Sequence, residues 1–535
     1  MNHPAEARQE DGPACAVPTA ATAPGSDRTT KAAKTAVVTL LQTFVSLAVG
    51  LVSVPILVRS LGRDAYGVWL LMGQAVSYLS LVDFGNASIA KLKLASAHSE
   101  DETSFKQDVL SATLLGVLVT TPLVAAAGGL IAAWLAFRYA DSALDFGTIV
   151  SAAGLLIAAF LVLRLASLPT FALFGANMEY RSAFGRLMIA TANSVLDIVA
   201  ALLGFGMVGL AANRLVAQLA LGLNLQRAAK RHVRWYGFTA FDWSKLGPLL
   251  KQNAFCLFAQ WGNTLVEAVD ILVVGIAVGA EAVPVYTITS ALPRLLFMLF
   301  NQAMSGANAG LVGLFGSGDK RRFHFVRTQQ EIVTLACLTV VGAVTLAVNR
   351  RFVGLWVGPE YYGGAILTAL AVAWYFAVIT SRHYCNALSA ALDFNRMARV
   401  QVTAGIAGFV AGVIGGRVAG IPGAVAGILA VRLAANLLNA WRLDELLDVP
   451  HGEHIAALRM PLAVAAASCA GGWTVGRLQL PDHLVVTGAM GAAVMATAGA
   501  AAWFLGVPAA AKADLMVRFQ RLARFLPRLP GAAAL

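Results

Sequence analysis

The sequence contains 535 residues, of which 58% are hydrophobic and 13% are charged. A soluble globular domain carries roughly 25% charged residues, so this composition argues against a soluble enzyme, a disordered scaffold and a nucleic-acid-binding domain. The formal net charge of +12 would suggest a polyanionic partner in a soluble protein. In a membrane protein, its first explanation is the concentration of Lys and Arg in cytoplasmic loops.

Fourteen apolar segments follow one another along the chain, separated by charged, proline or glycine residues. A membrane-spanning helix needs about 20 apolar residues, so the predicted fold is an all-α integral membrane protein with about 14 transmembrane helices. The predicted spans are 35–58, 66–86, 107–137, 148–173, 186–205, 209–227, 252–277, 283–312, 329–349, 364–391, 398–416, 421–441, 459–476 and 483–505. Residues 1–34 lack an apolar core, and we expect a disordered cytoplasmic tail there and not a signal peptide.

The distribution of basic residues predicts the topology. An even number of spans places both termini on one side of the membrane. Of the 40 Lys and Arg residues, 28 fall in the tails and even-numbered loops, and the odd-numbered loops hold only seven, Arg59, Arg63, Arg138, Arg350, Arg351, Arg417 and Arg477. The positive-inside rule then places both termini in the cytoplasm and the odd-numbered loops on the outer face.

The two halves of the chain share landmarks. These are Gln42 with Gln260, Ser46 with Thr264 and Arg214 with Arg432 at an offset of 218 residues, and Gly206-x-x-Gly209 with Gly420-x-x-Gly423 at an offset of 214. Six spans followed by six related spans in the same orientation predict two pseudo-symmetric lobes. Spans 13 and 14 are an addition outside this repeat.

The repeat also predicts the domain organisation. We expect a tail over 1–34, an N-lobe over 35–228 (spans 1–6), a basic cytoplasmic linker over 229–251, a C-lobe over 252–442 (spans 7–12), spans 13–14 over 443–505 and a second tail over 506–535. Basic and apolar residues mix between Asp514 and Pro530 in the last tail, which predicts an amphipathic helix on the anionic cytoplasmic leaflet.

Polar residues recur inside two of the predicted spans. Span 1 carries Gln42 and Ser46, and span 7 carries Gln260, Glu267 and Asp270. Such a stripe must face protein or water, because an unsatisfied polar group is costly in hydrocarbon. Hydrogen bonding between neighbouring helices would explain it, whereas the two acids of span 7 favour a hydrated cavity.

Five arginines also lie within the predicted spans, namely Arg164, Arg214, Arg294, Arg382 and Arg432. An arginine at the bilayer centre costs about 2.5–3.5 kcal/mol on insertion scales, so each needs a partner or a function. Asp197 is a candidate structural partner for Arg164. Arg294 follows Pro293, which bends a helix, and shares its span with Asn301.

Arg294, Arg432 and Arg214 are therefore the leading candidates for a cationic binding site. The planar fork of arginine binds phosphate with two hydrogen bonds and keeps its charge in a partly dehydrated site. A cavity with excess arginine suits an anion, above all a phosphate or a pyrophosphate.

Motifs of enzymatic chemistry are missing from the sequence. His451 and His454 are three residues apart, but we expect them in a cytoplasmic loop without a third metal ligand. No Walker motif occurs, and the five cysteines have no CxxC spacing. The sequence therefore predicts no enzyme, no cofactor and no metal site.

Three motifs carry a resemblance to a known family. They are Leu61-Gly62-Arg-Asp-Ala-Tyr66-Gly67-Val-Trp69, Ser77-Tyr78-x-x-Leu81-Val-Asp83-Phe-Gly85-Asn-Ala87 and Gly420-Ile-Pro-Gly423-Ala-Val-Ala. The first two resemble the first loop and second span of polysaccharide (O-antigen or exopolysaccharide) flippases in the multidrug/oligosaccharidyl-lipid/polysaccharide exporter superfamily. The third resembles the glycine motif that opens their twelfth span.

This resemblance implies translocation of an undecaprenyl-diphosphate-linked oligosaccharide across a bacterial inner membrane by alternating access. It implies membrane lipids as partners, and polysaccharide polymerase and export machinery as candidate partners. The diphosphate would bind the arginines, and the lipid tail would stay in the bilayer. Outward movement of two negative charges would release about 4–5 kcal/mol per 100 mV. Coupled entry of H+ or Na+ through Glu267 or Asp270 is the competing possibility.

Three alternatives stay open. A cation-coupled drug antiporter of the same superfamily would have an acidic cavity, whereas five interior arginines here face three acids, Asp197, Glu267 and Asp270. A non-transporting scaffold for polysaccharide synthesis would depend on its basic tails. An integral-membrane glycosyltransferase or ligase would need acidic residues beside a large extramembrane loop, and the sequence predicts no such loop.

Overall fold

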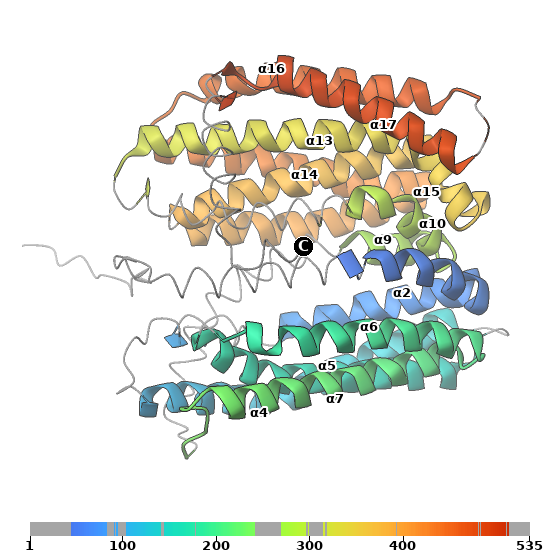
Figure 1. The fold of residues 1–535 in the computed structure, drawn as a ribbon, viewed down its shortest axis with the longest axis vertical. Helices are drawn as coiled ribbons and strands as arrows, with labels where there is room; N and C mark the ends of the chain where they lie inside the picture. Colours follow the sequence, from blue (N-terminus) through green and yellow to red (C-terminus); the bar gives the residue numbers. More distant parts are fainter. Residues whose placement is uncertain are drawn as a thin grey trace, which may run out of the picture.

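The computed structural model describes residues 44–45, 47–82, 90, 93–94, 103–140, 144–176, 178–240, 269–295, 298, 314–315, 318–391, 393–479, 481, 483–509 and 511–512. All regular secondary structure in these residues is helical, which confirms the predicted fold class. The labelled elements are α2 (Arg63–Ser77), η1 (Tyr78–Val82), α4 (Thr103–Tyr139), α5 (Phe146–Gly175), α6 (Tyr180–Leu202), α7 (Gly206–His232), α9 (Val269–Ala277), α10 (Ala282–Thr289), α13 (Lys320–Trp356), η5 (Pro359–Tyr361), α14 (Gly364–Ala390), α15 (Phe394–Leu447), α16 (His451–Gly476), α17 (Leu484–Ala501) and η6 (Ala502–Gly506) (Figure 1).

Nine helices in the described part of the chain are long and apolar enough to cross a bilayer, and they are α4 to α7, α13 to α16, and α17 together with η6. They overlap predicted spans 3–6 and 9–14. Of predicted spans 1, 2, 7 and 8, the structure describes the apolar helix Leu47–Leu61, α2, α9 and α10. The protein is therefore a multi-pass membrane protein.

Helix α15 contains two of the predicted spans. Its 54 residues would extend about 81 Å as one straight helix, far beyond a hydrocarbon core of about 30 Å. Ala419 and Gly420 have non-helical dihedral angles and divide it into two arms. The arms touch, because a Cβ atom on Gly415 would lie 2.2 Å from the carbonyl oxygen of Gly423. Predicted spans 11 and 12 thus form a hairpin.

The glycine landmark of the internal repeat has a conformational cause. Gly206 begins α7 and Gly420 begins the second arm of α15, and their φ angles are 58° and 63°. Glycine adopts this left-handed region without the steric cost that other residues meet. The two halves therefore enter their sixth span through a similar backbone turn.

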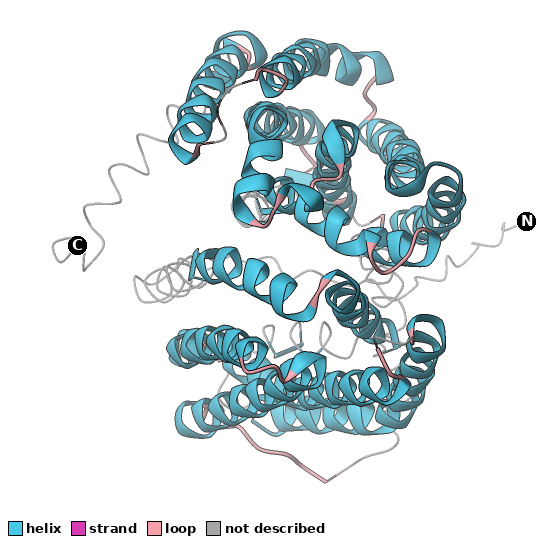
Figure 2. Cartoon of the chain, turned by 90° about the vertical axis from the view of Figure 1, so that its right-hand side faces the viewer, coloured by secondary structure: helices cyan, strands magenta, loops and turns pink. Residues whose placement is uncertain are grey.

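The helices form two bundles (Figures 1 and 2). In the N-bundle (α2 and α4–α7), α5 packs against α4 and α7, and α6 packs against α7. In the C-bundle (α9, α10 and α13–α17), α13 packs against α14, α16 and α17, and α14 packs against α15. The bundles meet where α9, which packs on α15, also contacts α2.

Hydrogen bonds join the bundles at the predicted outer face. The Tyr139 hydroxyl donates to the carbonyl oxygen of Gly275 at 2.9 Å, and Arg63 Nε donates to the carbonyl oxygen of Glu281 at 2.9 Å. Arg63 and Glu281 are 218 residues apart, which is the offset of the predicted repeat. Corresponding loops of the two halves are thus in contact.

Close packing accompanies these hydrogen bonds. A Cβ atom on Gly67 would lie 2.1 Å from the carbonyl oxygen of Ala280, so only glycine permits this approach of α2 to the loop after α9. Buried apolar residues of both bundles, among them Leu71 and Val273, form one continuous cluster here. The bundles are therefore closed against each other at this end.

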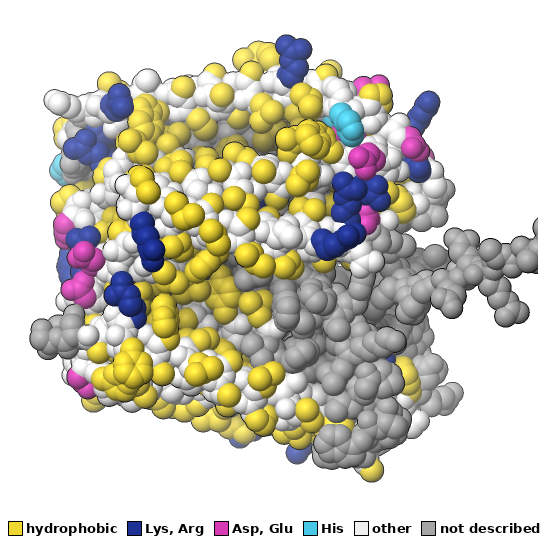
Figure 3. All heavy atoms as spheres, turned by 180° about the vertical axis from the view of Figure 1, so that it is seen from behind, with side chains coloured by type: hydrophobic (Ala, Val, Ile, Leu, Met, Phe, Trp, Pro, Cys, Tyr) yellow, Lys and Arg dark blue, Asp and Glu magenta, His cyan; other side chains and the backbone are white. Residues whose placement is uncertain are grey.

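The surface fits a membrane environment. Figure 3 shows a broad apolar face, with many of the charged side chains toward the two ends of the helices. Large apolar side chains are exposed at the molecular surface, such as Phe137 at 80% and Val418 at 82%. In a membrane, lipid chains would cover these apolar side chains. In water the same side chains would form a large exposed apolar surface.

Candidate functional site

A cavity of 460 Å³ lies between the two bundles. Its volume falls within the range of about 300–1,000 Å³ that is typical of small-molecule sites. The residues that line it are Trp69, Leu70, Gly73, Gln74, Val76 and Ser77 of α2, Leu156, Ala159, Phe160 and Leu163 of α5, Arg214 and Gln218 of α7, and Ile271 and Arg294 of the C-bundle. Because both bundles contribute walls, a rotation of one bundle against the other would change the shape of this cavity.

Residues of the C-bundle orient Arg294. Its Nε donates a hydrogen bond of 2.8 Å to the Tyr375 hydroxyl, and its Nη2 lies 3.7 Å from Oδ2 of Asp270. Tyr286 donates to the same carboxylate oxygen at 2.6 Å. The Asp270 side chain is 4% exposed and the Arg294 side chain is 33% exposed. The carboxylate thus holds the guanidinium from its buried side, and the rest of Arg294 reaches the cavity.

Arg214 lines the same cavity from the N-bundle. It lies on α7, and its side chain is exposed. The Asp197 carboxylate on α6 interacts electrostatically with it, although the described residues contain no ion pair of Arg214 within 4 Å. The cavity thus receives one guanidinium group from each bundle, with Asp197 near Arg214 and Asp270 behind Arg294. Because Arg214 is exposed and Arg294 is partly exposed, both groups could donate to an anion in the cavity.

The structure brings together three of the nine residues predicted for the site. Arg214 and Arg294 line the cavity, and Asp270 supports Arg294. Gln42, Ser46, Gln260, Glu267 and Asn301 lie outside the described residues.

Arg432 is the ninth predicted residue, and it lies within the C-bundle. It is 3% exposed, and its Nη1 donates to Oε1 of Gln401 at 2.8 Å and to Oγ of Ser381 at 3.1 Å. These contacts join α14 to the two arms of α15. Arg432 does not line the cavity between the bundles, so its correspondence with Arg214 is one of sequence position and not of surroundings.

The predicted ion pair between Arg164 and Asp197 does not form. Arg164 Nη2 donates to the hydroxyl of Thr120 at 2.6 Å, and Asp197 accepts from the side-chain amide of Asn213 at 2.7 Å. Helices α5 and α6 are consecutive in the sequence, but α5 packs against α4 and α7. Arg164 therefore meets the helix that precedes α5 in the sequence and not the helix that follows it.

Some cavity residues were absent from the predicted site. Gln74, Ser77 and Gln218 add polar groups, and Gln74 Nε2 donates to Ser77 Oγ at 3.1 Å. Their polarity within apolar spans was a usable signal. Trp69 and Phe160 add aromatic surface, and the sequence contains no signal that separates them from aromatic residues facing lipid.

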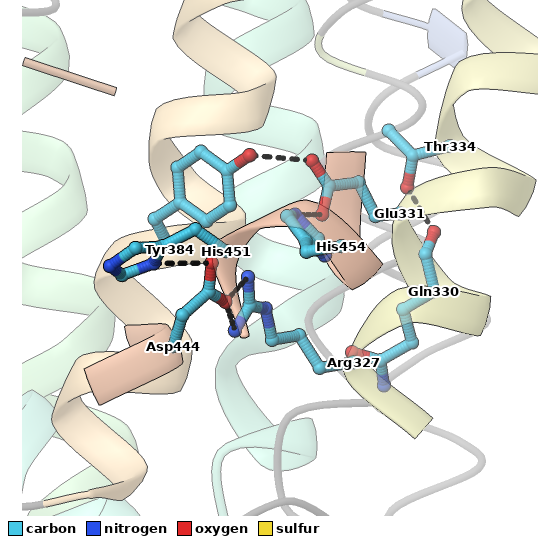
Figure 4. A network of polar contacts seen from close by, with 8 residues as sticks. All are labelled: Arg327, Gln330, Glu331, Thr334, Tyr384, Asp444, His451 and His454. Atoms are coloured by element: carbon cyan, nitrogen blue, oxygen red, sulfur yellow. Dashed lines mark hydrogen bonds and ion pairs between the residues drawn. The ribbon is translucent and has the colours of Figure 1, made fainter. Parts of the chain in front are cut away.

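A second polar network lies inside the C-bundle (Figure 4). Glu331 of α13 accepts a hydrogen bond of 2.7 Å from the Tyr384 hydroxyl, and its other oxygen lies 3.3 Å from Nε2 of His454 on α16. Beside it, Arg327 Nη2 lies 3.2 Å from Oδ1 of Asp444 on α15. All five of these side chains are buried. The network fastens the first of the two additional helices to the six-helix repeat.

The two histidines of this region were predicted in a loop, and that prediction is wrong. Helix α16 begins at His451, so both residues are helical. His451 Nδ1 lies 3.3 Å from Oδ2 of Asp444, whereas His454 pairs with Glu331. The first turns of α16 are polar, so the local hydropathy is low and does not indicate where the helix starts.

Comparison with known proteins identifies related molecules. Residues 56–361 match the family described as "Polysaccharide biosynthesis protein". The structure of the "Lipid II flippase MurJ, inward closed conformation" is similar with a TM-score of 0.62 and 12% sequence identity, over 87% of this chain and 98% of that chain. The inward-facing conformation of a "multidrug resistance MATE family transporter of the MOP superfamily" gives 0.57 and 15%, over 77% and 98%. The outward-facing conformation gives 0.55 and 15%, over 79% and 97%. No curated protein matches the sequence.

The family match extends over more than half of the chain, and the structural similarities show a shared fold. The chain therefore belongs to the polysaccharide biosynthesis protein family, in the membrane fold that MurJ and the MATE transporters also adopt.

Proposed function

We propose that the protein is a flippase that moves an undecaprenyl-diphosphate-linked oligosaccharide from the cytoplasmic to the outer face of a bacterial inner membrane. The observation that carries the proposal is that Arg214 and Arg294, from different bundles, line one cavity. A diphosphate offers acceptor oxygens to both guanidinium groups, and charge-assisted hydrogen bonds to phosphate are among the stronger polar contacts in proteins. Membership of a polysaccharide biosynthesis family supports this class of substrate.

The remaining surface of the cavity suits the rest of the substrate headgroup. Gln74, Ser77 and Gln218 offer donors and acceptors for sugar hydroxyls, and Trp69 and Phe160 offer aromatic surface. The polyprenyl chain would stay in the bilayer, so the protein does not need to bury this long tail. This division of the substrate matches a cavity of moderate size between two bundles.

Transport would proceed by alternating access. In the present state the bundles are joined at the predicted outer face through Tyr139 and Arg63. Outward release of the headgroup requires these contacts to break while the bundles close at the opposite end. Among the described residues, these contacts and the hydrogen bond from Trp356 of α13 to the carbonyl oxygen of Leu51 in the first span are each worth about 0.5–1.5 kcal/mol, so substrate binding could shift the balance between the two states.

Charge movement would contribute to the direction of transport. Two negative charges that leave a negative interior gain about 4–5 kcal/mol per 100 mV. Asp270 is the described candidate for a coupling group, because it lies 3.7 Å from the guanidinium of Arg294. An incoming diphosphate would compete for Arg294 and leave Asp270 free to take up a cation. Both termini would lie in the cytoplasm, and polymerase and export machinery would act on the translocated product.

Reconstitution of the full chain into liposomes tests the proposal. A diphosphate-linked oligosaccharide lipid is incorporated, and its appearance in the opposite leaflet is followed with a membrane-impermeant lectin. We expect flipping by the wild type and at least a tenfold loss of rate for Arg214→Gln. Arg417→Gln, which neutralises an exposed arginine away from the cavity, should keep the wild-type rate.

The same assay separates the alternatives. If the wild type flips nothing under an imposed potential or ion gradient and exports an organic cation instead, the antiporter reading replaces this proposal. If the wild type flips the lipid and Arg214→Gln flips it equally fast, the assignment of the cavity is overturned.

A further inference from the structure

A second pocket, of 660 Å³, lies in the C-bundle. It is formed where α13 ends, α14 begins and α16 ends, at the side of the bundle drawn on the right in Figure 1. We call it the arginine pocket, and its lining residues are Leu346, Arg350, Arg351, Gly354, Leu355, Pro359, Tyr362, Ala365, Thr368, Trp473, Gly476 and Arg477. It shares no residue with the cavity between the bundles.

The arginine pocket gathers positive charge where little is expected. Arg350, Arg351 and Arg477 are three of only seven basic residues in the predicted outer loops. No acidic residue is among the described residues that line the pocket. Arg350 and Arg477 are exposed, and the described chain supplies neither with an ion-pair partner. Membrane proteins place few basic residues on the outer side, so three in one pocket call for a local reason.

Two of the three arginines are held in place. Arg351 is 5% exposed, and its Nη2 donates to the carbonyl oxygen of Leu478 at 2.5 Å. The guanidinium of Arg477 lies over the ring of Trp473, 5.1 Å from the ring centroid. A cation above an aromatic face is stabilised by about 0.5–1 kcal/mol at exposed sites. Arg351 and Arg477 are thus ordered before any ligand arrives.

The rest of the lining suits an amphiphile. Tyr362 and Thr368 provide hydroxyl groups, and Thr368 lies on α14 within hydrogen-bond distance of the Asn349 amide, at 3.1 Å. Leu346 and Leu355 provide apolar surface, and Leu355 is 44% exposed at the molecular surface. A ligand with a phosphate head and a hydrocarbon tail would satisfy both parts.

We propose that the arginine pocket is a second anion site, which binds the phosphate group of a lipid on the predicted outer face. Arginine binds phosphate oxygens with paired, charge-assisted hydrogen bonds. In this assignment Arg350 and Arg477 bind the phosphate directly, while Arg351 contributes charge and holds the loop after α16. The lipid is either a polyprenyl diphosphate, which would bind in the pocket after its translocation, or an anionic phospholipid of the outer leaflet. The inference goes beyond the proposed function and does not require it.

Native mass spectrometry of the purified full chain tests this site. The probes are farnesyl diphosphate, phosphatidylglycerol and, as a zwitterionic control, phosphatidylcholine. We expect the wild type to bind at least one anionic probe at the arginine pocket, and Arg350→Gln with Arg477→Gln to weaken binding of that equivalent at least tenfold, without affecting a diphosphate bound in the cavity between the bundles. Arg417→Gln is the matched control and should bind like the wild type, because it neutralises a predicted outer-face arginine outside the pocket. Arg477→Gln alone should show a partial loss, which guards against misfolding of the double variant.

The probes and variants give distinct outcomes. Loss of one bound equivalent of farnesyl diphosphate in the double variant, with the equivalent at the cavity between the bundles retained, identifies the polyprenyl lipid as the source of the phosphate. Loss of phosphatidylglycerol binding alone identifies the phospholipid. Equal binding of both anionic probes by the wild type and the double variant would overturn the inference. Arg214→Gln should still bind lipid at the arginine pocket. A loss of flipping in Arg214→Gln and a loss of lipid binding at the arginine pocket are therefore separate results.

Discussion

The hydroxyl of Tyr139 on α4 donates a hydrogen bond of 2.9 Å to the carbonyl oxygen of Gly275 on α9, and this bond joins the N-bundle to the C-bundle. Tyr139 is 9% exposed and belongs to the apolar cluster that both bundles share. Its bond must break when the predicted outer face opens. The pair therefore reports directly on the equilibrium between the closed and open states.

Tyr139→Phe should favour the open state. A single hydrogen bond is worth about 0.5–1.5 kcal/mol, which corresponds to a roughly 2- to 13-fold change in population. Spin labels at Phe137 and Arg417, both exposed, would report the distance between the bundles in a background without native cysteines. Tyr236→Phe is the control, since Tyr236 donates to Gln226 within the N-bundle region. Identical distance distributions for both variants would refute the role of Tyr139.

Gly67→Ala should open the same contact more strongly. The added methyl carbon would lie 2.1 Å from the carbonyl oxygen of Ala280, a separation that forces the backbones apart. The same spin-label pair should show a shift toward longer distances. Gly73→Ala on the same helix meets nothing within 4 Å, so it should leave the distances unchanged. If Gly67→Ala keeps the wild-type distances, the packing of Gly67 against Ala280 does not determine whether the bundles are closed.

Arg432→Ala should destabilise the C-bundle without removing the cavity site. The substitution leaves the buried oxygen of Gln401 without its donor, and an unsatisfied buried group costs about 1–3 kcal/mol. Thermal unfolding should show a lower midpoint, whereas binding of a diphosphate lipid per folded molecule should match the wild type. Loss of binding at full stability would instead place Arg432 in the substrate path.

Glu331→Gln should loosen the attachment of α16. The buried Glu331 carboxylate lies 3.3 Å from His454 across α13 and α16, and weakening the contacts of a buried polar group costs about 1–3 kcal/mol. Limited proteolysis should cut the α15–α16 connection faster than in the wild type. Glu453→Gln is the control, because Glu453 is exposed in the first turn of α16. Equal cleavage rates would show that the network does not secure this helix.

Hydropathy predicted the fold well, because a bilayer imposes one requirement on every span. The positions of α4, α5 and α14 follow from their apolar lengths. The starts of α13 and α16 do not follow from apolar length, because their first turns are polar and have the composition of a loop. The hairpin of α15 was predictable from Gly420, because a glycine at that position allows the turn.

Contacts between helices were harder to predict than the helices themselves. The approach of Gly67 to Ala280 joins segments more than 200 residues apart, and no periodicity in the sequence marks it. Arg164 meets Thr120 on the preceding helix and not Asp197 on the following one, because α5 packs against α4 and α7. The repeat offset paired Arg214 with Arg432, but it does not specify the rotation of each helix, so one lies in the cavity and the other inside the C-bundle.

The central claim is that Arg214 and Arg294 bind one diphosphate together, and a double-mutant cycle on ligand binding tests it most directly. Affinities of a diphosphate-linked oligosaccharide lipid are measured for the wild type, Arg214→Gln, Arg294→Lys and the double variant. Arg294→Lys keeps the charge beside Asp270 and removes the planar fork. The account predicts that the two losses are coupled by about 0.5–3 kcal/mol, as for residues that share a partner. Losses that add independently, or an affinity that none of the variants changes, would contradict it.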